Sequence, residues 1–359
     1  MPKLSDVAHL GKAVTDSLQR GAPDIDMDTV PKMLDLSAEG LTDNVIAVNA
    51  NTGNQRQKLV MEVLVRHLHA FASEVALTTE EWKTAIEFLT KTGQTCSDIR
   101  QEFILLSDVF GLSALVDILN HPKPEGATES TLLGPFFVED AKTISLGESI
   151  ASEGKGEPML VRGRGNPIMR CMIDTWETDQ DGFYDTQYTE YENDCRGRLY
   201  TDANGRYAFR GILPVAYPIP NDGPVGQLLR TMHRHVFRPA HLHFSFVTAS
   251  SSLLRRFISG VTSSSRGRHI SVDQLIGSDA VFGVKSSLIV ETTRVTDPDE
   301  ARRLGFSSDS FHLVEYDFVL LTKEEAAFEQ AKVRHAASSR IVHPQVEVVG
   351  TSVALRSLP

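Results

Sequence analysis

Residues 234–246 read R-H-V-F-R-P-A-H-L-H-F-S-F, an apolar-rich run that predicts a β-strand. Because successive side chains of a strand point to opposite faces, His241 and His243 share one face while Leu242 and Phe244 share the other. Two imidazoles on one strand face suit a single metal ion, which could be zinc, copper, iron or nickel. Taken alone, the pair is more often two unrelated histidines, one buried and one on the surface.

The composition is that of a globular protein, with 41% hydrophobic and 23% charged residues among 359. The net charge of −11 argues against a nucleic-acid partner, since such proteins usually carry a basic patch. No apolar run approaches the roughly 20 residues of a membrane span, and the first residues do not resemble a signal peptide. The three widely spaced cysteines, Cys96, Cys171 and Cys195, indicate free thiols and a reducing, cytoplasmic location.

The first third of the chain is predicted to be helical. Apolar positions recur through residues 54–75, which contain no Gly or Pro, and residues 96–119 predict a second, continuous helix. Between them, Thr78 and Glu81 have the spacing of a capping box. The apolar residues that follow have the i, i+3, i+4, i+7 spacing of one buried face: Trp82, Ala85, Ile86 and Leu89.

A second H-x-H sequence, His67-Leu68-His69, lies on the helix predicted over residues 54–75. Residues two apart on a helix do not face each other, so His67 and His69 form a poor chelate. They are predicted to be exposed or to bond to other groups.

From Met159 onward, short β-type runs alternate with turn sequences, which predicts a sandwich or barrel. The dipeptide Asn204-Gly205 lies between two such runs and is a strong hairpin signal. The predicted strands cover residues 168–176, 198–201, 206–209, 281–295 and 311–321.

The predicted fold class is therefore α+β, in three parts. A helical N-terminal unit covers residues 1–125, and an all-β sandwich covers residues 126–322. A tail over residues 323–359 begins with a helix and continues with a surface-packed segment over residues 340–353.

Six of the seven tyrosines lie between Tyr184 and Tyr217, just before the histidine strand. Tyr184 follows a turn, and Tyr217 lies in a Pro-rich stretch that cannot pair as a central strand. A phenolate is a hard, anionic oxygen ligand, which suits Fe(III) better than Cu(I) or a structural zinc. Tyrosines also cluster for packing alone, with the hydroxyl at the surface. The chain contains no H-E-x-x-H, no G-x-S-x-G and no phosphate-binding Gly loop.

Taken together, the motifs resemble the intradiol ring-cleavage dioxygenases, non-haem Fe(III) enzymes that open catechol-type rings between the two hydroxyl groups. The resemblance extends from Leu59 to Leu321. Its sequences are T-G-Q-T-C-S-D-I-R-Q-E-F-I-L-L-S-D-V-F-G (92–111), L-L-G-P-F-F (132–137), D-G-F-Y-D (181–185), T-D-A-N-G-R-Y-A-F-R (201–210), P-V-A-Y-P-I-P-N-D-G-P-V-G-Q-L-L (214–229), R-P-A-H-L-H-F (238–244) and V-F-G-V-K-S-S-L (281–288). The Y-P-x-P-x-D-G-P-V-G sequence and residues 281–288 are most similar to the hydroxyquinol-cleaving branch, whose product is 3-hydroxy-cis,cis-muconate or maleylacetate.

The resemblance implies a role for individual residues. Four positions match the iron ligands: Tyr184, Tyr217, His241 and His243. Arg238 matches the arginine that faces the substrate ring, and Tyr217 matches the ligand that leaves the metal to act as a base. Nine further positions match the substrate pocket: Leu105, Asp108, Leu132, Leu133, Gly134, Pro135, Phe136, Ile219 and Pro220.

A regular strand would turn Arg238 away from the histidines, since it precedes His241 by three residues. The resemblance therefore implies a bend at Pro239. One departure concerns residues 254–258 and 263–268, which replace the polar strand and acidic loop usual in the family. This departure affects one wall of the pocket, and so the preferred ring substituent.

The resemblance further implies one Fe(III) per subunit, with O2 and an aromatic diol or triol as substrates. It also implies a homodimer through the N-terminal helices, with a phospholipid bound at the interface. Within the family, the alternative reaction is that of a catechol 1,2-dioxygenase, which gives cis,cis-muconate.

Two alternatives from other classes remain at this point. A zinc or Fe(II) site would need a third ligand beside the pair, and His233 and His235 are close enough in sequence to be candidates. A non-catalytic β-sandwich that binds an aromatic ligand would not require all four predicted ligands.

Overall fold

The computed structural model describes residues 28, 30–31, 37–98, 100–166, 170–190, 192–248, 251–261, 275 and 277–340, with backbone only for 166, 248, 251–261 and 337–340. Contacts divide the chain into two units, Met1–Phe88 and Leu89–Pro359, which are described separately. The predicted domain boundaries after residues 125 and 322 stay predictions. Residues 263–268 and 341–353, for which expectations were stated, lie outside the described residues.

The first unit contains helices α2 (Ala38–Asn49) and α3 (Gln55–Glu74) and the start of α4 (Thr79–Thr95). The helix predicted over residues 54–75 is confirmed as α3. Its side-chain cap is Asn54, whose Oδ1 accepts the Gln57 N–H at 3.0 Å.

The predicted capping box is also confirmed. Thr78 Oγ1 accepts the Glu81 N–H at 3.2 Å, and Glu81 Oε2 accepts the Thr78 N–H at 2.9 Å. The helical histidine pair behaves as predicted, because His69 Nδ1 bonds to Thr42 Oγ1 at 2.9 Å while His67 is exposed.

The predicted burial of the apolar face of α4 is wrong for the single chain. Trp82 is 52% exposed and Ile86 is 46% exposed, and Leu89 and Ala85 are exposed as well. The periodicity correctly marks an apolar face, but such a face is buried only where another element covers it.

The continuous helix predicted over residues 96–119 is also wrong. Two helices, α5 (Glu102–Val109) and α6 (Leu112–Asn120), occupy this region. Gly111 between them has a φ of +72°, a left-handed conformation that glycine adopts without steric cost and that ends the helical path.

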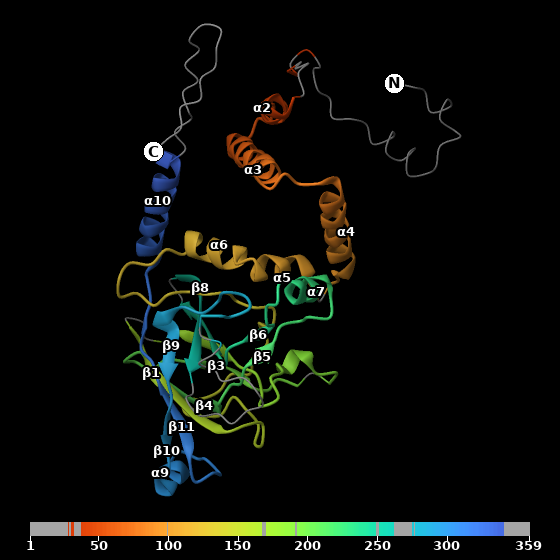
Figure 1. Cartoon of the computed structure of the whole chain (residues 1–359). Coiled ribbons are helices and arrows are strands. Elements are labelled where there is room, and N and C mark those ends of the chain that lie inside the picture. Colours follow the sequence, from red (N-terminus) through yellow and green to blue (C-terminus); the bar gives the residue numbers. More distant parts are fainter. Residues whose placement is uncertain are drawn as a thin grey trace, which may run out of the picture. The chain divides into compact units, whose positions relative to one another are not determined.

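Two five-stranded sheets form the second unit, together with a small two-stranded sheet (Figure 1). The first sheet has the order β10-β11-β1-β12, with β4 also paired to β1: β10 (Thr293–Val295), β11 (Phe311–Glu315), β1 (Pro158–Asn166), β12 (Phe318–Val319) and β4 (Arg206–Ile212). The second has the order β3-β2-β7-β8-β9: β3 (Arg196–Tyr200), β2 (Met172–Trp176), β7 (Leu242–Thr248), β8 (Ser251–Val261) and β9 (Ile289–Glu291). The small sheet joins β5 (Tyr217–Pro218) to β6 (Phe237–Arg238).

The two large sheets pack face to face over one apolar core. Phe209 of β4 and Phe244 of β7 have ring centroids 5.9 Å apart, and Phe318 of β12 lies 4.5 Å from Phe246 of β7. A common core between two sheets is the defining feature of a sandwich. The α+β class and the β-sandwich are therefore confirmed.

The remaining helices of this unit lie outside the sandwich. Figure 1 shows α5, α6 and α7 together at one end of the sheets and α9 beside β10 at the opposite end. Their bounds, with those of the 3₁₀ turns, are α7 (Pro224–Thr231), α9 (Pro298–Arg303), α10 (Lys323–Arg340), η3 (Asp185–Gln187) and η4 (Ser286–Leu288). The helix predicted at the start of the tail is confirmed as α10.

No helix in the described part of the chain is long and apolar enough to cross a membrane.

Cys96, Cys171 and Cys195 are all free thiols, as predicted. The cytoplasmic location stays a prediction.

The hairpin predicted at Asn204-Gly205 is wrong. The turn exists, because Asp202 Oδ1 accepts the N–H groups of Asn204 and Arg206, each at 2.8 Å. The strands that it joins belong to different sheets, since β3 pairs with β2 and β4 pairs with β1. An Asn-Gly turn reverses the chain, but the longer pairing with β1 decides which sheet β4 enters.

The single strand predicted over residues 234–246 is wrong in one respect that matters for the site. It is divided into β6 and β7, and residues 239–241 between them belong to neither strand. Pro239 has no N–H to donate to a sheet. The bend expected at Pro239 is therefore present, and it separates Arg238 from the histidine strand.

The strand predicted over residues 281–295 is only partly correct. Its second half forms β9 and β10, but residues 281–285 form a loop. In that loop the N–H groups of Val281 and Gly283 donate to the carboxylate of Asp279 rather than to a neighbouring strand.

Candidate active site

Four side chains with oxygen or nitrogen donors converge at one end of the sandwich. Tyr184 Oη lies 2.9 Å from His243 Nε2, 3.4 Å from His241 Nε2 and 3.4 Å from Tyr217 Oη. None of the four residues is more than 6% exposed. The structure thus brings together all four predicted iron ligands, which are called the donor cluster below.

Strand alternation explains how β7 contributes to the cluster. His243 faces the donors, while Leu242 and Phe244 face the core of the sandwich. Trp176 is directly opposite His243 on β2, and the two rings stack with centroids 4.7 Å apart and planes 3° apart. The stacking fixes the plane of the imidazole.

His241 is oriented by the bend that precedes it. Its Nδ1 lies 2.7 Å from the carbonyl oxygen of Pro239, which places the ring proton on Nδ1. The lone pair of Nε2 then points at Tyr184 Oη. A backbone carbonyl on the far ring nitrogen is the usual orienting contact of a metal-binding histidine.

Burial disfavours charge on three members of the donor cluster, Tyr184, His241 and His243. Burial lowers the pKa of His241 and His243, and nearby positive charge lowers both further. Burial, followed by the neighbouring Tyr217, raises the pKa of Tyr184 well above 10. Two imidazole nitrogens and two phenol oxygens form a donor set that fits a hard, highly charged metal ion.

An all-histidine or histidine–carboxylate site is not supported. Among the described residues, no group of three or more His, Cys, Asp or Glu side chains is placed to hold a metal ion. His235 instead bonds through Nε2 to Ser278 Oγ at 3.1 Å and through Nδ1 to the Phe237 N–H at 3.2 Å. His233 is exposed.

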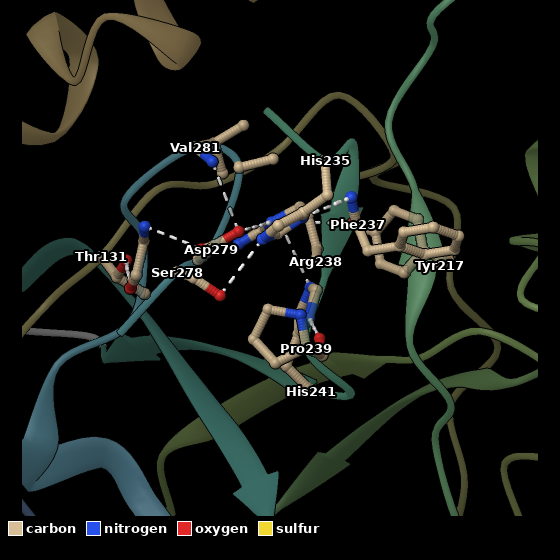
Figure 2. Close-up of polar contacts among 12 residues, drawn as sticks. Thr131, Tyr217, His235, Phe237, Arg238, Pro239, His241, Ser278, Asp279 and Val281 are labelled. Atoms are coloured by element: carbon tan, nitrogen blue, oxygen red, sulfur yellow. Dashed lines mark hydrogen bonds and ion pairs between the residues drawn. The ribbon is translucent and has the colours of Figure 1, made fainter. Parts of the chain in front are cut away.

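Arg238 lies against the donor cluster, as Figure 2 shows. Its Nη1 is 3.2 Å from Tyr217 Oη and 3.3 Å from His241 Nε2. Its Nε pairs with Asp279 Oδ1 at 3.3 Å. Asp279 was missed in the sequence, although it lies two residues before the family motif that begins at Val281.

Several predicted pocket residues surround the cluster. Phe136 stacks on Tyr184 with centroids 4.4 Å apart, and Leu133 packs in the same apolar group. A Cβ atom at Gly134 would lie 3.9 Å from His243 Cε1.

The other predicted pocket residues are less closely involved. Burial raises the pKa of Asp108 on α5, while the hydrogen bond from Ser113 and, less strongly, the charge of Arg238 act against that rise. Ile219 is buried directly after β5. Leu105 and Leu132 are half-buried, whereas Pro135 and Pro220 are exposed.

A second ion pair, also missed in the sequence, supports the Tyr184 side. Arg196 donates from Nε and Nη2 to the two carboxylate oxygens of Asp185, and both side chains are buried. Arg196 Nη2 also donates to the carbonyl oxygen of Phe136 at 3.1 Å. The pair therefore anchors both Tyr184, through the adjacent Asp185, and the ring stacked on it.

Comparison with known proteins assigns the class. Residues 54–128 match the family model described as the catechol dioxygenase N terminus, and residues 132–322 match the one described as dioxygenase. The chain belongs to the intradiol ring-cleavage dioxygenases, as its motifs predicted. Members of this family are generally dependent on non-haem iron and commonly dimeric.

Individual relatives are similar over most of their length. The chain is 47% identical to the hydroxyquinol 1,2-dioxygenase of Rhizobium sp., over 79% of this chain and 95% of that one. It is 44% identical to the intradiol ring-cleavage dioxygenase hqdA of Aspergillus niger, over 84% of this chain and 90% of that one. The solved hydroxyquinol 1,2-dioxygenase of Pseudomonas putida DLL-E4 is 39% identical, with a TM-score of 0.72 over 80% of this chain and 99% of that one.

Proposed function

We propose that this protein cleaves hydroxyquinol (benzene-1,2,4-triol) with O2 and Fe(III) to 3-hydroxy-cis,cis-muconate or maleylacetate, inserting both oxygen atoms. The observation that carries the proposal is the convergence of the donor cluster beside Arg238. Relatives named as hydroxyquinol 1,2-dioxygenases, 41–47% identical to this chain, support the choice of substrate.

One Fe(III) per subunit would be held by Tyr184, Tyr217, His241 and His243. Two phenolates offset two of its three positive charges, which neutral histidines alone would not do. When bound, the ferric ion supplies a Lewis acid that withdraws electron density from a coordinated diol.

The chain's own groups supply the proton transfer and the charge stabilisation. Tyr217 Oη receives a proton from a substrate hydroxyl, and Tyr184 stays in place. Arg238 Nη1 lies 3.2 Å from Tyr217 Oη, so the guanidinium stabilises negative charge that develops on the ring beside it. Trp176 and Phe136 shield the donors from water.

The substrate ring is proposed to lie between Arg238 and the segment 132–136. The walls are formed by the pocket positions taken from the family resemblance: Leu105, Asp108, Leu132, Leu133, Gly134, Pro135, Phe136, Ile219 and Pro220.

The deciding experiment measures oxygen uptake by the iron-loaded protein with hydroxyquinol, catechol and a chlorocatechol, alongside its iron content and visible absorbance. We expect a burgundy protein, from tyrosinate-to-Fe(III) charge transfer, with the highest kcat/KM for hydroxyquinol. A higher kcat/KM for catechol would contradict the proposed substrate but not the proposed ferric site. Full activity in a colourless, iron-free protein would overturn the proposal.

A homodimer through the N-terminal helices, with a phospholipid at the interface, is part of the proposal. Support comes from α3, where Leu68 and Phe71 are each 55% exposed on the single chain. Light scattering of the purified protein measures the mass, and mass spectrometry of an organic extract detects lipid. A monomer at micromolar concentration would contradict this part alone.

A further inference from the structure

The loop from Ser278 to Gly283 surrounds the guanidinium of Arg238. Asp279, whose side chain is only 1% exposed, accepts Arg238 Nε on Oδ1 at 3.3 Å. The same carboxylate accepts the N–H of Gly283 on Oδ2 at 2.8 Å and that of Val281 on Oδ1 at 3.3 Å. One buried carboxylate therefore fixes both the shape of the loop and one edge of the guanidinium.

Gly283 forms the surface on which the guanidinium rests. A Cβ atom at this position would lie 2.9 Å from Arg238 Nη2 and 3.2 Å from Asp279 Oδ2, distances that require one of the neighbours to move. The loop is also held by Thr131, whose hydroxyl donates to the carbonyl oxygen of Gly283 at 2.5 Å. A side chain at residue 283 would therefore press on Arg238 Nη2.

The loop is also bonded to the segment that carries Arg238, as Figure 2 shows for His235 and Ser278. The Ala280 N–H donates to the Phe237 carbonyl at 3.3 Å. The Ala280 carbonyl accepts Arg234 Nη2 at 3.0 Å. Three hydrogen bonds thus tie the loop to the segment that carries Arg238.

We infer that Asp279 and Gly283 are positioning residues that aim Arg238 Nη1 at Tyr217 Oη and hence at the substrate ring. The inference rests on the proposed function, which defines the role of Arg238. Without the Asp279 charge, the contact to Arg238 Nε weakens, and the guanidinium is no longer held toward Tyr217.

Two variants test the inference, each with a matched control. Asp279→Asn removes the charge at constant size, and Gly283→Ala adds one methyl group against Nη2 while keeping the ion pair. Asp174→Asn removes a buried carboxylate that pairs with Arg198 at 2.6 Å on β2 and β3. Gly165→Ala adds a methyl group where nothing lies within 4 Å.

We expect both test variants to keep the iron content and the visible absorption of the unmodified enzyme. Their kcat/KM for hydroxyquinol should fall by about 100-fold, as for a group displaced by about 1 Å, while both controls stay unchanged. In an Arg238→Ala background neither test variant should cause a further loss, since both act through Arg238.

The outcomes separate this inference from the proposed function. If Arg238→Ala loses activity but Asp279→Asn and Gly283→Ala do not, the inference is wrong and the proposed function stands. If Arg238→Ala keeps full activity, both the role of Arg238 and the inference fail. Should Asp279→Asn not fold, Gly283→Ala alone decides, and an equal additional loss in the Arg238→Ala background would overturn the inference.

Discussion

The two tyrosines of the donor cluster stand beside two buried arginine–aspartate pairs of different geometry. On the Tyr184 side, Arg196 donates two N–H groups to both oxygens of Asp185 and a third contact to the Phe136 carbonyl. These contacts tie the guanidinium of Arg196 to the backbone and side chain of its neighbours. Tyr184 is further held by the stacked ring of Phe136. The bidentate geometry is the strong, directional form of this interaction.

On the Tyr217 side the pair is monodentate. Arg238 reaches Asp279 through Nε alone and turns Nη1 toward Tyr217 Oη. An arginine whose N–H groups point into a pocket can stabilise negative charge that develops on a bound substrate. The contrast between the two pairs supports the proposal that Tyr184 stays in place while Tyr217 changes its bonding as the base.

Replacing the tyrosines one at a time should give the largest difference between the two sides of the site. Tyr217→Phe removes the base and should lower kcat by about 10³- to 10⁴-fold at near-normal iron content. Tyr184→Phe should instead lose iron, since it removes a fixed donor. Iron analysis and stopped-flow turnover measure the two effects. A Tyr217→Phe enzyme with full iron and normal kcat would exclude Tyr217 from the reaction.

Breaking the bidentate pair should mainly affect stability. Asp185→Asn leaves Arg196 buried without its counter-charge, which should cost about 3–5 kcal/mol in the free energy of unfolding. Urea unfolding measures this loss. Asp174→Asn is the control, because its partner Arg198 is partly exposed, and it should cost less. Equal losses of unfolding free energy in the two variants would contradict the larger stabilising role given to the Arg196–Asp185 pair.

Removing the monodentate pair's arginine should mainly affect activity. Arg238→Ala should keep iron and colour and lower kcat/KM by about 10²- to 10³-fold, as loss of a charge-stabilising donor does. Arg238→Lys should recover little, because an ammonium group cannot span Asp279 and Tyr217 as a planar guanidinium does. Steady-state kinetics at saturating O2 provides the measurement. A lysine variant with normal kcat/KM would show that charge alone suffices.

Among the described residues, Glu177 is a buried carboxyl with no arginine partner, unlike Asp185 and Asp279. Its expected effect is on how stability depends on pH. Burial raises the pKa of Glu177 well above 4.5. Its Oε1 accepts the Ile212 N–H at 2.9 Å, and its Oε2 has no hydrogen-bond partner in the described part of the chain. The folded protein thus keeps a proton that the unfolded chain releases above pH 4.5, so this group's stabilisation is lost as pH rises.

Glu177→Gln is neutral at every pH and removes this dependence. Its stability relative to the unmodified protein should therefore rise between pH 5 and pH 8, by at most about 1.4 kcal/mol per pH unit. Urea midpoints at four pH values give the comparison. Parallel stability curves for the two proteins would show that Glu177 is ionised in the folded state.

Local patterns in the sequence predicted much of this architecture. Alternation correctly placed His243 toward the site and Phe244 toward the core, the apolar repeat located α3, and the capping box located the start of α4. The family motifs identified the donor cluster, which the fold then brings within hydrogen-bond distance. These successes share one cause, because each rests on residues close in sequence or on a motif that carries its own spacing.

The failures concern pairings between distant segments. Nothing near Asn204-Gly205 reveals that β4 enters the other sheet, because β1 is far from it in sequence. Asp279 is 41 residues from Arg238, and their contact depends on the packing of a loop against β6. The exposed face of α4 was misjudged for a related reason, since periodicity identifies an apolar surface but not what covers it.

Pro239 places Arg238 and His243 on different sheets. Arg238 belongs to the two-stranded sheet, whereas His243 belongs to a five-stranded sheet of the sandwich. The arginine proposed to face the ring therefore lies apart from the histidine strand, although Tyr217 of β5 shares the small sheet with it. Selection for activity on bulkier aromatic rings should accumulate substitutions around β6 and the loop packed on it, while β7 and Tyr217 remain constant.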